Sequence, residues 1–249
     1  MNNVGCATPD AVSNDVEWTI DADLSVQSVI ERPDCPPLIY EALMRLFSWQ
    51  VRVETSVRRA LGSPRLAPSF VAALLALGSE VTIGEGSDAT RAELRALIEG
   101  DAKGRVSAVH VPACRGERRC GHAVVARTPA DEPIVAAYAA IEMEGPSVRQ
   151  ARIALTGVWP EPARLAQAPQ MLVGGPAGPD GVESVASAVA LEVAPRGDYL
   201  GSVEYRRAMA AVLARRALEE CLLQKCLLQE CRLGECLSEE SMPEEGSDG

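Results

Sequence analysis

Hydrophobic residues in the first half of the chain recur at spacings that predict short strands and helices. Strands are expected over 16–20, 79–83 and 106–111, and helices over 21–31, 38–49, 68–77 and 90–98. The helix over 38–49 is expected to bury one face, made of Leu38, Ala42, Leu43, Leu46 and Phe47. Ser87 or Asp88 is the expected cap of the helix over 90–98. The irregular separation of the strands indicates an α+β chain.

The second half of the chain is expected to hold three strands followed by three helices. Apolar residues alternate over 122–126, 134–142 and 152–158, although the alanines of 134–142 are also compatible with a helix. Helices are expected over 163–173, 182–193 and 202–223. Ser202 is the expected N-cap of the last one. Its buried stripe is expected to be Met209, Val212, Leu213, Ala217 and Leu218.

Composition narrows the class of protein. With 249 residues, 47% of them hydrophobic, the chain can form one large domain or two small ones. The net charge of -11 argues against nucleic acid as a partner, because phosphate binding needs clustered basic residues. Residues 1–16 do not resemble a secretory signal, and no run of about 20 apolar residues could span a membrane. A cytoplasmic location with reduced cysteines is therefore expected.

A five-residue repeat begins after the last predicted helix and places Cys221, Cys226, Cys231 and Cys236 in register. A metal site is one interpretation, but structural zinc sites use two close ligand pairs. Along a helix, steps of five residues turn by about 140°, so the thiols would spread around the axis. A slippage repeat that extends the last helix is the favoured interpretation, and four repeats are too few for a pentapeptide coil. The acidic residues after Ser238 and the residues 1–15 are expected to be disordered.

Two stretches of the C-terminal half carry a family resemblance. They read ARIALTGVWPEPARLAQAPQML from Ala151 and GDYLGSVEYRRAMAAVLARRAL up to Leu218. Together they resemble the C-terminal domain of the flavoprotein (medium) subunit of molybdenum hydroxylases, the group that holds xanthine and carbon monoxide dehydrogenases. The resemblance implies a partial FAD-binding (PCMH-type) subdomain over 16–112. It further implies a three-stranded antiparallel sheet packed on a three-helix bundle over 113–220, with 221–249 as a helix extension and tail.

A third stretch, SWQVRVETSVRRAL over 48–61, resembles the family segment that ends in Thr-Ile-Gly-Gly-Asn-Leu. Gln50, Arg52, Ser56, Val57 and Leu61 match it in identity or type. The paired glycines of the family let the backbone approach the flavin closely, since a Cβ there would clash or strain the backbone. Arg58 and Arg59 stand in their place, where their bulk would fill the flavin space although their charge could attract a pyrophosphate.

The resemblance names six candidate cofactor-binding positions: Ser56, Val57, Arg58, Arg59, Leu61 and Asp131. Asp131 ends the stretch 126–131, which is similar to an arginine-to-aspartate stretch of the family, and a turn cap is its alternative role. The acidic residue that follows the family's glycines has no counterpart in 62–67. An earlier glycine-rich loop of the family has none in 1–15, so an N-terminally truncated flavoprotein with a degenerate flavin loop is expected.

Three weaker constellations have alternative interpretations. Cys114, Cys120 and His122 could bind a metal, although a loop joining two strands is favoured. Tyr205 and Arg206 could dock a partner subunit, although a helix start with an exposed charged face is favoured. Arg215 and Arg216 are expected on a solvated face. With only two histidines, no Ser-His-Asp site can be assembled with confidence.

Two functional hypotheses follow from the resemblance. The first is an oxidoreductase subunit that passes electrons from a molybdenum centre, by way of iron–sulfur clusters and FAD, to an outside acceptor. Its expected partners are a molybdopterin-binding large subunit and an iron–sulfur small subunit. The second is a noncatalytic structural or regulatory paralogue that docks with such a complex without FAD.

Overall fold

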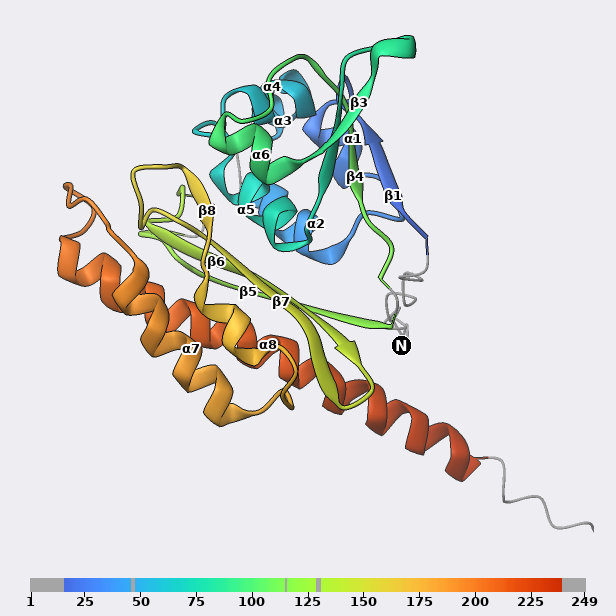
Figure 1. Ribbon diagram of the computed structural model, residues 1–249, viewed down its shortest axis with the longest axis vertical. Helices are drawn as coiled ribbons and strands as arrows, with labels where there is room; N and C mark the ends of the chain where they lie inside the picture. The colour runs from blue at the N-terminus through green and yellow to red at the C-terminus, as the bar shows by residue number, and fades with distance from the viewer. Residues whose placement is uncertain (1–15, 46–47, 115, 129–130, 239–249) are drawn as a thin grey trace, which may run out of the picture.

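The computed structural model describes residues 16–45, 48–114, 116–128 and 131–238, with the side chains described up to residue 223. Four predicted features lie outside this part of the chain, so the structure does not describe them: residues 1–15, Leu46, Phe47 and the acidic tail after Ser238. The described elements form two antiparallel four-stranded sheets with helices, which confirms the predicted α+β class (Figure 1).

The N-terminal unit contains a sheet in the order β1-β4-β2-β3. Its strands are β1 (Trp18–Asp21), β2 (Glu80–Ile83), β3 (Thr90–Glu93) and β4 (Val106–Val111). Its helices are α1 (Val26–Ile30), α2 (Pro37–Met44), α3 (Trp49–Glu54), α4 (Val57–Gly62), α5 (Pro68–Ala76) and α6 (Leu94–Glu99), with the 3-10 turn η1 (Gly86–Asp88). Every residue of α5 is buried, so this helix forms the centre of the core.

Three helices predicted for this unit differ from the observed elements. The helix over 21–31 is confined to α1, because Ser25 caps it by accepting a hydrogen bond from the Ser28 amide. The helix over 38–49 is divided into α2 and α3. The segment 90–98 begins as strand β3, which pairs with β2, and becomes helical only in α6. Ser87 and Asp88 therefore belong to η1 and cap no helix there.

The C-terminal unit contains a sheet in the order β5-β6-β7-β8 and two long helices. The elements are β5 (Glu117–Val125), β6 (Val135–Glu144), β7 (Ser147–Thr156), β8 (Ala163–Leu165), the 3-10 turn η2 (Ala168–Leu172), α7 (Pro179–Glu192) and α8 (Val203–Ser238). The three predicted strands and two of the predicted helices are present. The helix predicted over 163–173 is wrong, because Ala163 and Leu165 pair with β7 as a fourth strand.

The sheet of the C-terminal unit lies between the N-terminal unit and the pair α7 and α8 (Figure 1). Tyr138 of β6 packs into the core of the N-terminal unit. Ala139 and Ile141 of the same strand pack into the second core with α7 and α8. Because β6 is buried on both faces, its sequence is continuously apolar, which explains why its periodicity was compatible with a helix.

Helix α8 continues through the cysteine repeat to Ser238, past the end of the sheet, as the favoured interpretation of the repeat predicts (Figure 1). Leu213, Ala217 and Leu218 of its predicted stripe are buried, and so is Cys221. The side chains of Cys226, Cys231 and Cys236 lie outside the described part. Within the described residues, no group of three His, Cys, Asp or Glu side chains could hold a metal, and no helix is long and apolar enough to cross a membrane.

Candidate functional site

The predicted flavin loop forms the start of helix α4. Ser56 is its N-cap, and the Ser56 side chain accepts a hydrogen bond of 3.2 Å from the Arg59 amide. Val57 and Leu61 point into the core, whereas Arg59 is exposed. Three of the five predicted positions in this segment thus have structural roles that follow from capping and burial.

The backbone amides at the start of α4 are already hydrogen-bonded within the chain. The Val57 amide donates to the carbonyl oxygen of Leu24 at 2.9 Å, and the Arg58 amide donates to that of Ala22 at 2.7 Å. Together with the bond from the Arg59 amide to Ser56, these contacts occupy the first three N–H groups of the helix. A helix N-terminus binds phosphate through its free N–H groups, and these three are not free.

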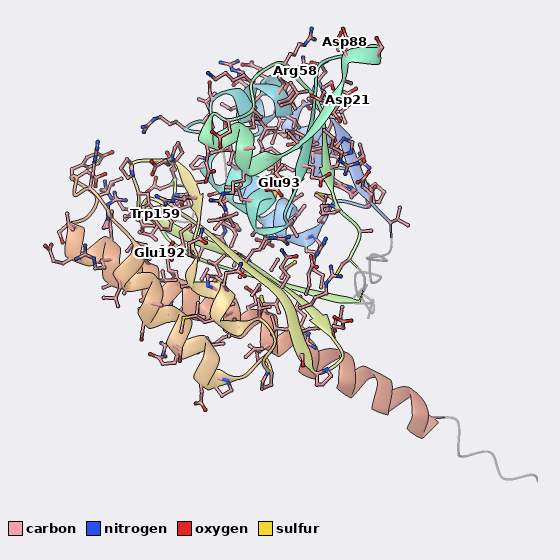
Figure 2. All side chains as sticks on the ribbon, viewed as in Figure 1. Asp21, Arg58, Asp88, Glu93, Trp159 and Glu192 are labelled. Atoms are coloured by element: carbon pink, nitrogen blue, oxygen red, sulfur yellow. The ribbon has the colours of Figure 1, made fainter. Side chains whose placement is uncertain are left out.

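The Arg58 side chain fills the space beside these amides. Its Nε donates to the carbonyl oxygen of Val106 at 2.8 Å, and its guanidinium forms a two-point ion pair with Asp23. The hydrogen bonds from Arg58 lower the pKa of the Asp23 carboxyl, which keeps the pair charged. Arg58 therefore links α4 to the β1–α1 connection and to β4. Figure 2 shows Arg58 in this N-terminal unit.

These observations test whether the FAD implied by the resemblance fits at α4. The family positions a pair of glycines where the backbone must approach the ligand, whereas Arg58 here carries a side chain anchored on Asp23 and Val106. The first three amides of α4 donate to oxygen atoms of the chain itself. The residues at α4 do not fit the group.

Asp131, the sixth predicted position, lies in the connection between β5 and β6. It is exposed, and its amide donates to the carbonyl oxygen of Thr128 at 3.2 Å, as expected for a residue in a turn. No hydrogen bond or ion pair among the described residues joins it to α4. The structure therefore groups the five positions of α4 but does not bring Asp131 into contact with them.

Next to Asp131 a cleft of about 450 Å³ lies between the two units. The N-terminal unit contributes Arg65 and Pro68, from the end of the α4–α5 connection and the first turn of α5. The C-terminal unit contributes the segments around Glu132, Trp159 and Asp198, together with Arg206. Desolvation raises the pKa of Glu132. Figure 2 shows Trp159 in the C-terminal unit, away from Arg58.

Arg206 is buried beneath this cleft and is only 5% exposed, so both interpretations of it as an exposed or docking residue are wrong. Its Nη1 donates to the carbonyl oxygens of Ile134 at 2.7 Å and Gly157 at 2.8 Å, and its Nη2 donates to both Asp198 carboxylate oxygens. Gly157 has φ +73°, and a Cβ there would lie 2.1 Å from the Ile134 oxygen. Arg206 thus joins three connecting segments around α8.

The predictions that Ser202 caps α8 and that Arg215 and Arg216 face solvent are confirmed. Ser202 caps the helix by accepting a hydrogen bond of 3.2 Å from the Tyr205 amide, and Tyr205 is 38% exposed. Arg215 is exposed and lies 3.8 Å from Glu183 of α7 and from Glu219. Exposed pairs of this kind contribute little to stability.

A buried charge cluster at the other end of the second sheet has no signal in the sequence pattern. Glu142 of β6 is 4% exposed and lies 3.0 Å from Arg118, 3.0 Å from Arg149 and 3.6 Å from Arg152. Burial opposes ionisation of Glu142, but the hydrogen bonds from Arg149 and Arg118 outweigh it and lower its pKa. The strand register that places Arg118 opposite Glu142 is the information that would have revealed the cluster.

Cys114, Cys120 and His122 do not form a metal site. His122 stacks on Tyr138 and lies 3.7 Å from Glu41 of α2 and 3.6 Å from Glu220 of α8. Burial raises the pKa of the Cys120 thiol to about 12. The favoured interpretation, a loop joining two strands, holds for Cys114 but is wrong for Cys120 and His122, which lie within β5.

Two antiparallel four-stranded sheets, with α5 packed against the second sheet and the pair α7 and α8 over its outer face, define the class of protein as α+β. Residues 122–221 match the model of the CO dehydrogenase flavoprotein C-terminal domain. This part of the chain is similar to that domain family, and the resemblance seen in the sequence is confirmed.

Relatives of known name agree with this assignment. The glyceraldehyde dehydrogenase medium chain of Sulfolobus acidocaldarius is 25% identical over 190 residues, which cover 74% of this chain and 67% of the relative. A CO dehydrogenase chain from Oligotropha carboxidovorans is similar in fold, with a TM-score of 0.71 and 22% identity over 82% of this chain and 75% of that one. A chain of quinoline 2-oxidoreductase from Pseudomonas putida 86 has a TM-score of 0.68 and 21% identity over 82% and 74%. At these identities the two structural likenesses establish the fold alone.

Proposed function

We propose that this chain is a noncatalytic paralogue of molybdenum-hydroxylase medium subunits, which docks with such a complex without binding FAD. The single observation that carries the proposal is the anchored Arg58 at the start of α4. Its side chain is held by Asp23 and Val106, and its amide is held by Ala22. The fold of the medium subunit is thus retained while the position of the family's flavin loop is filled.

The expected partners are a molybdopterin-binding large subunit and an iron–sulfur small subunit. Support comes from the C-terminal domain family and from the similarity to a dehydrogenase medium chain. In a complete complex the cofactors carry out the redox chemistry, and a protein without flavin contributes only binding and positioning. The role proposed here is therefore to occupy the place of a medium subunit and to alter assembly or electron flow.

A variant at α4 tests the reason for the loss of flavin. Arg58→Gly with Arg59→Gly is expected to leave the protein without FAD in an equilibrium titration followed by flavin fluorescence. The double substitution empties the side-chain space, but the amides at positions 57 and 58 still donate to Leu24 and Ala22. Arg59→Gly alone is the matched control, because it keeps the pair between Arg58 and Asp23.

FAD binding by the double variant and not by Arg59→Gly would show that the arginine side chains alone exclude the flavin. Stoichiometric FAD in the unaltered chain would instead support the first hypothesis, an electron-transferring flavoprotein subunit, and would overturn the proposal. Thermal unfolding of each variant separates a loss of fold from a change in binding. The double variant loses the ion pair with Asp23, whose side chain is 61% exposed, and the bond from Arg58 to Val106.

A further inference from the structure

We propose that the C-terminal end of helix α8 pairs with the same segment of a second copy of this chain, as a short parallel coiled coil. The inference goes beyond the proposed function, since it concerns self-association and neither FAD nor a partner subunit. It rests on three observations: the helix continues past the second sheet, one line of positions along it faces solvent, and that line becomes an apolar stripe.

Helix α8 is fixed to the second sheet near Glu220 and Cys221. The Glu220 carboxylate accepts a hydrogen bond of 2.6 Å from the His122 amide, and the Cys221 thiol donates to the carbonyl oxygen of Ala139 at 3.9 Å. Beyond this point the helix backbone continues past the end of the sheet (Figure 1). Residues 224–238 extend it by about 22 Å, at about 1.5 Å per residue. A helical segment of this length is marginal in water by itself, so contact with another helix would stabilise it.

One line of positions along α8 faces solvent where the side chains are described. It passes through Arg215, Glu219 and Leu222, in steps of four and three residues that stay on one side of a helix in a coiled coil. The Arg215 and Glu219 side chains are 44% and 51% exposed. Leu222 is half-buried, and Leu223 beside it is 62% exposed. The second sheet therefore does not cover this side of the helix.

From Leu222 onward the same line becomes a mostly apolar stripe. Its positions are Leu222, Cys226, Gln229, Leu233 and Cys236. Steps of four and three residues are those of the core positions a and d in a heptad lettered a to g. A polar residue such as Gln229 in the middle of the core favours the register in which it meets its own copy. The stripe is little more than two heptads long, so we expect a dimer that dissociates on dilution.

The charges beside the stripe select a second copy in a parallel arrangement. With Leu222 and Gln229 at position d, Lys225 takes position g and Glu230 takes the following position e. In a parallel pair, position g of one helix faces the next position e of the other, so Lys225 of each copy would face Glu230 of the other. Two ion pairs between the copies follow from this single register.

An antiparallel arrangement is disfavoured by the same charges. Lys225 and Arg232 both take position g, and in an antiparallel pair the g positions of the two helices face each other. Like charges would then meet between the copies. The segment 224–238 carries two positive and two negative side chains, so it is balanced in charge although the whole chain has a net charge of -11. A parallel second copy is therefore the occupant that the charges fit.

Sedimentation velocity of the full chain, under reducing conditions and over a wide range of concentration, tests this inference. The unaltered chain is expected to change from monomer to dimer as its concentration rises. Leu233→Glu places a charge in the stripe and is expected to weaken dimer formation by about tenfold or more. Lys225→Glu is expected to weaken it by about fivefold, and Glu230→Lys added to that variant is expected to restore it. Leu228→Glu is the matched control at position c, outside the stripe, and is expected to leave dimer formation unchanged.

Oxidation by diamide tests the parallel register. Diamide takes two electrons and two protons from a pair of thiols, which then join in one S–S bond. Cys226 and Cys236 take core positions, where a parallel pair places each of them opposite its own copy, whereas Cys231 takes the outer position f. A cross-linked dimer is expected from the unaltered chain and from Cys231→Ser. It is expected to be lost when Cys226→Ser and Cys236→Ser are combined.

A monomer at every concentration would overturn this inference. Equal losses in Leu233→Glu and Leu228→Glu, or cross-linking that requires Cys231, would overturn it as well. All these substitutions lie past the residues that fix α8 to the second sheet, so the variants are expected to fold, which circular dichroism checks. The result is separate from the proposed function, because FAD binding to the unaltered chain would overturn the noncatalytic role and leave the dimer unaffected.

Discussion

Replacing Glu142 by glutamine is expected to lower the free energy of unfolding by about 3–5 kcal/mol. Glu142 is 4% exposed and is the carboxylate that Arg118, Arg149 and Arg152 share. Without it, the Arg118 side chain, only 7% exposed, would be buried beside two like charges. The loss is therefore mainly the cost of unpaired buried charge, which exceeds the value of the ion pairs themselves.

Chemical denaturation of the full chain measures this effect, with Glu144→Gln as the matched control. Glu144 lies two residues along the same strand and is exposed, so its substitution is expected to change stability by less than about 0.5 kcal/mol. Equal stabilities of the two variants would contradict the account of the cluster.

The same cluster predicts a dependence of stability on pH. The pKa of Glu142 is lower in the folded chain than in the unfolded chain, so the folded state gains stability above the unfolded pKa. That stability is lost as the pH falls through the lowered pKa of the folded state. Acid unfolding of the unaltered chain is therefore expected to be steeper than that of Glu142→Gln, as followed by circular dichroism. If the acid-unfolding curves of the unaltered chain and of Glu142→Gln are parallel, Glu142 does not have this role.

Gly121→Ala is the second substitution with a large expected effect, a loss of about 3 kcal/mol in unfolding free energy. A Cβ at this position of β5 would lie 2.1 Å from the carbonyl oxygen of Ala217 and 2.9 Å from Cβ of Glu220. The obstacle is helix backbone, which a rotamer change cannot move. Either α8 or β5 must shift, and the 2.6 Å hydrogen bond from the His122 amide to Glu220 is expected to be lost.

Gly62→Ala provides the control for that substitution. Gly62 is the last residue of α4, and a Cβ there meets nothing within 4 Å. Alanine is favoured over glycine in a helix, so this variant is expected to be as stable as the unaltered chain or more stable by up to about 1 kcal/mol. Thermal unfolding of both variants distinguishes the close approach of α8 from a general effect of removing glycine.

Elements with a strong local signal were predictable from the sequence, and elements that depend on pairing were not. Helix α5 is apolar throughout and begins at Pro68, and it was predicted to within a residue. The segment 90–98 has helical periodicity, but its first half is strand β3 because it pairs with β2 and Arg91 bridges Glu80 and Glu17. Segment 163–173 was mispredicted for the same reason, since β8 exists only beside β7.

The residues of the candidate site show the same difference between local signals, which the sequence contains, and contacts between distant residues, which it does not reveal. The resemblance predicts that Arg58 and Arg59 decide flavin binding, because the family motif has glycines there. It could not predict that Asp23, Val106 and Ala22 would hold Arg58, since these contacts join residues far apart in the chain. Arg206 was misjudged because a charged residue at a helix start is usually exposed, whereas three connecting segments close over it here.

The flavin content of this chain purified together with its expected large and small subunits tests the central claim most directly. Visible absorbance of the purified complex, and of the chain after incubation with excess FAD, gives the ratio of flavin to protein. We predict no flavin above background in either sample, because the Arg58 side chain occupies the space at the start of α4 and the amides there are already hydrogen-bonded. One FAD for each copy of this chain would contradict it.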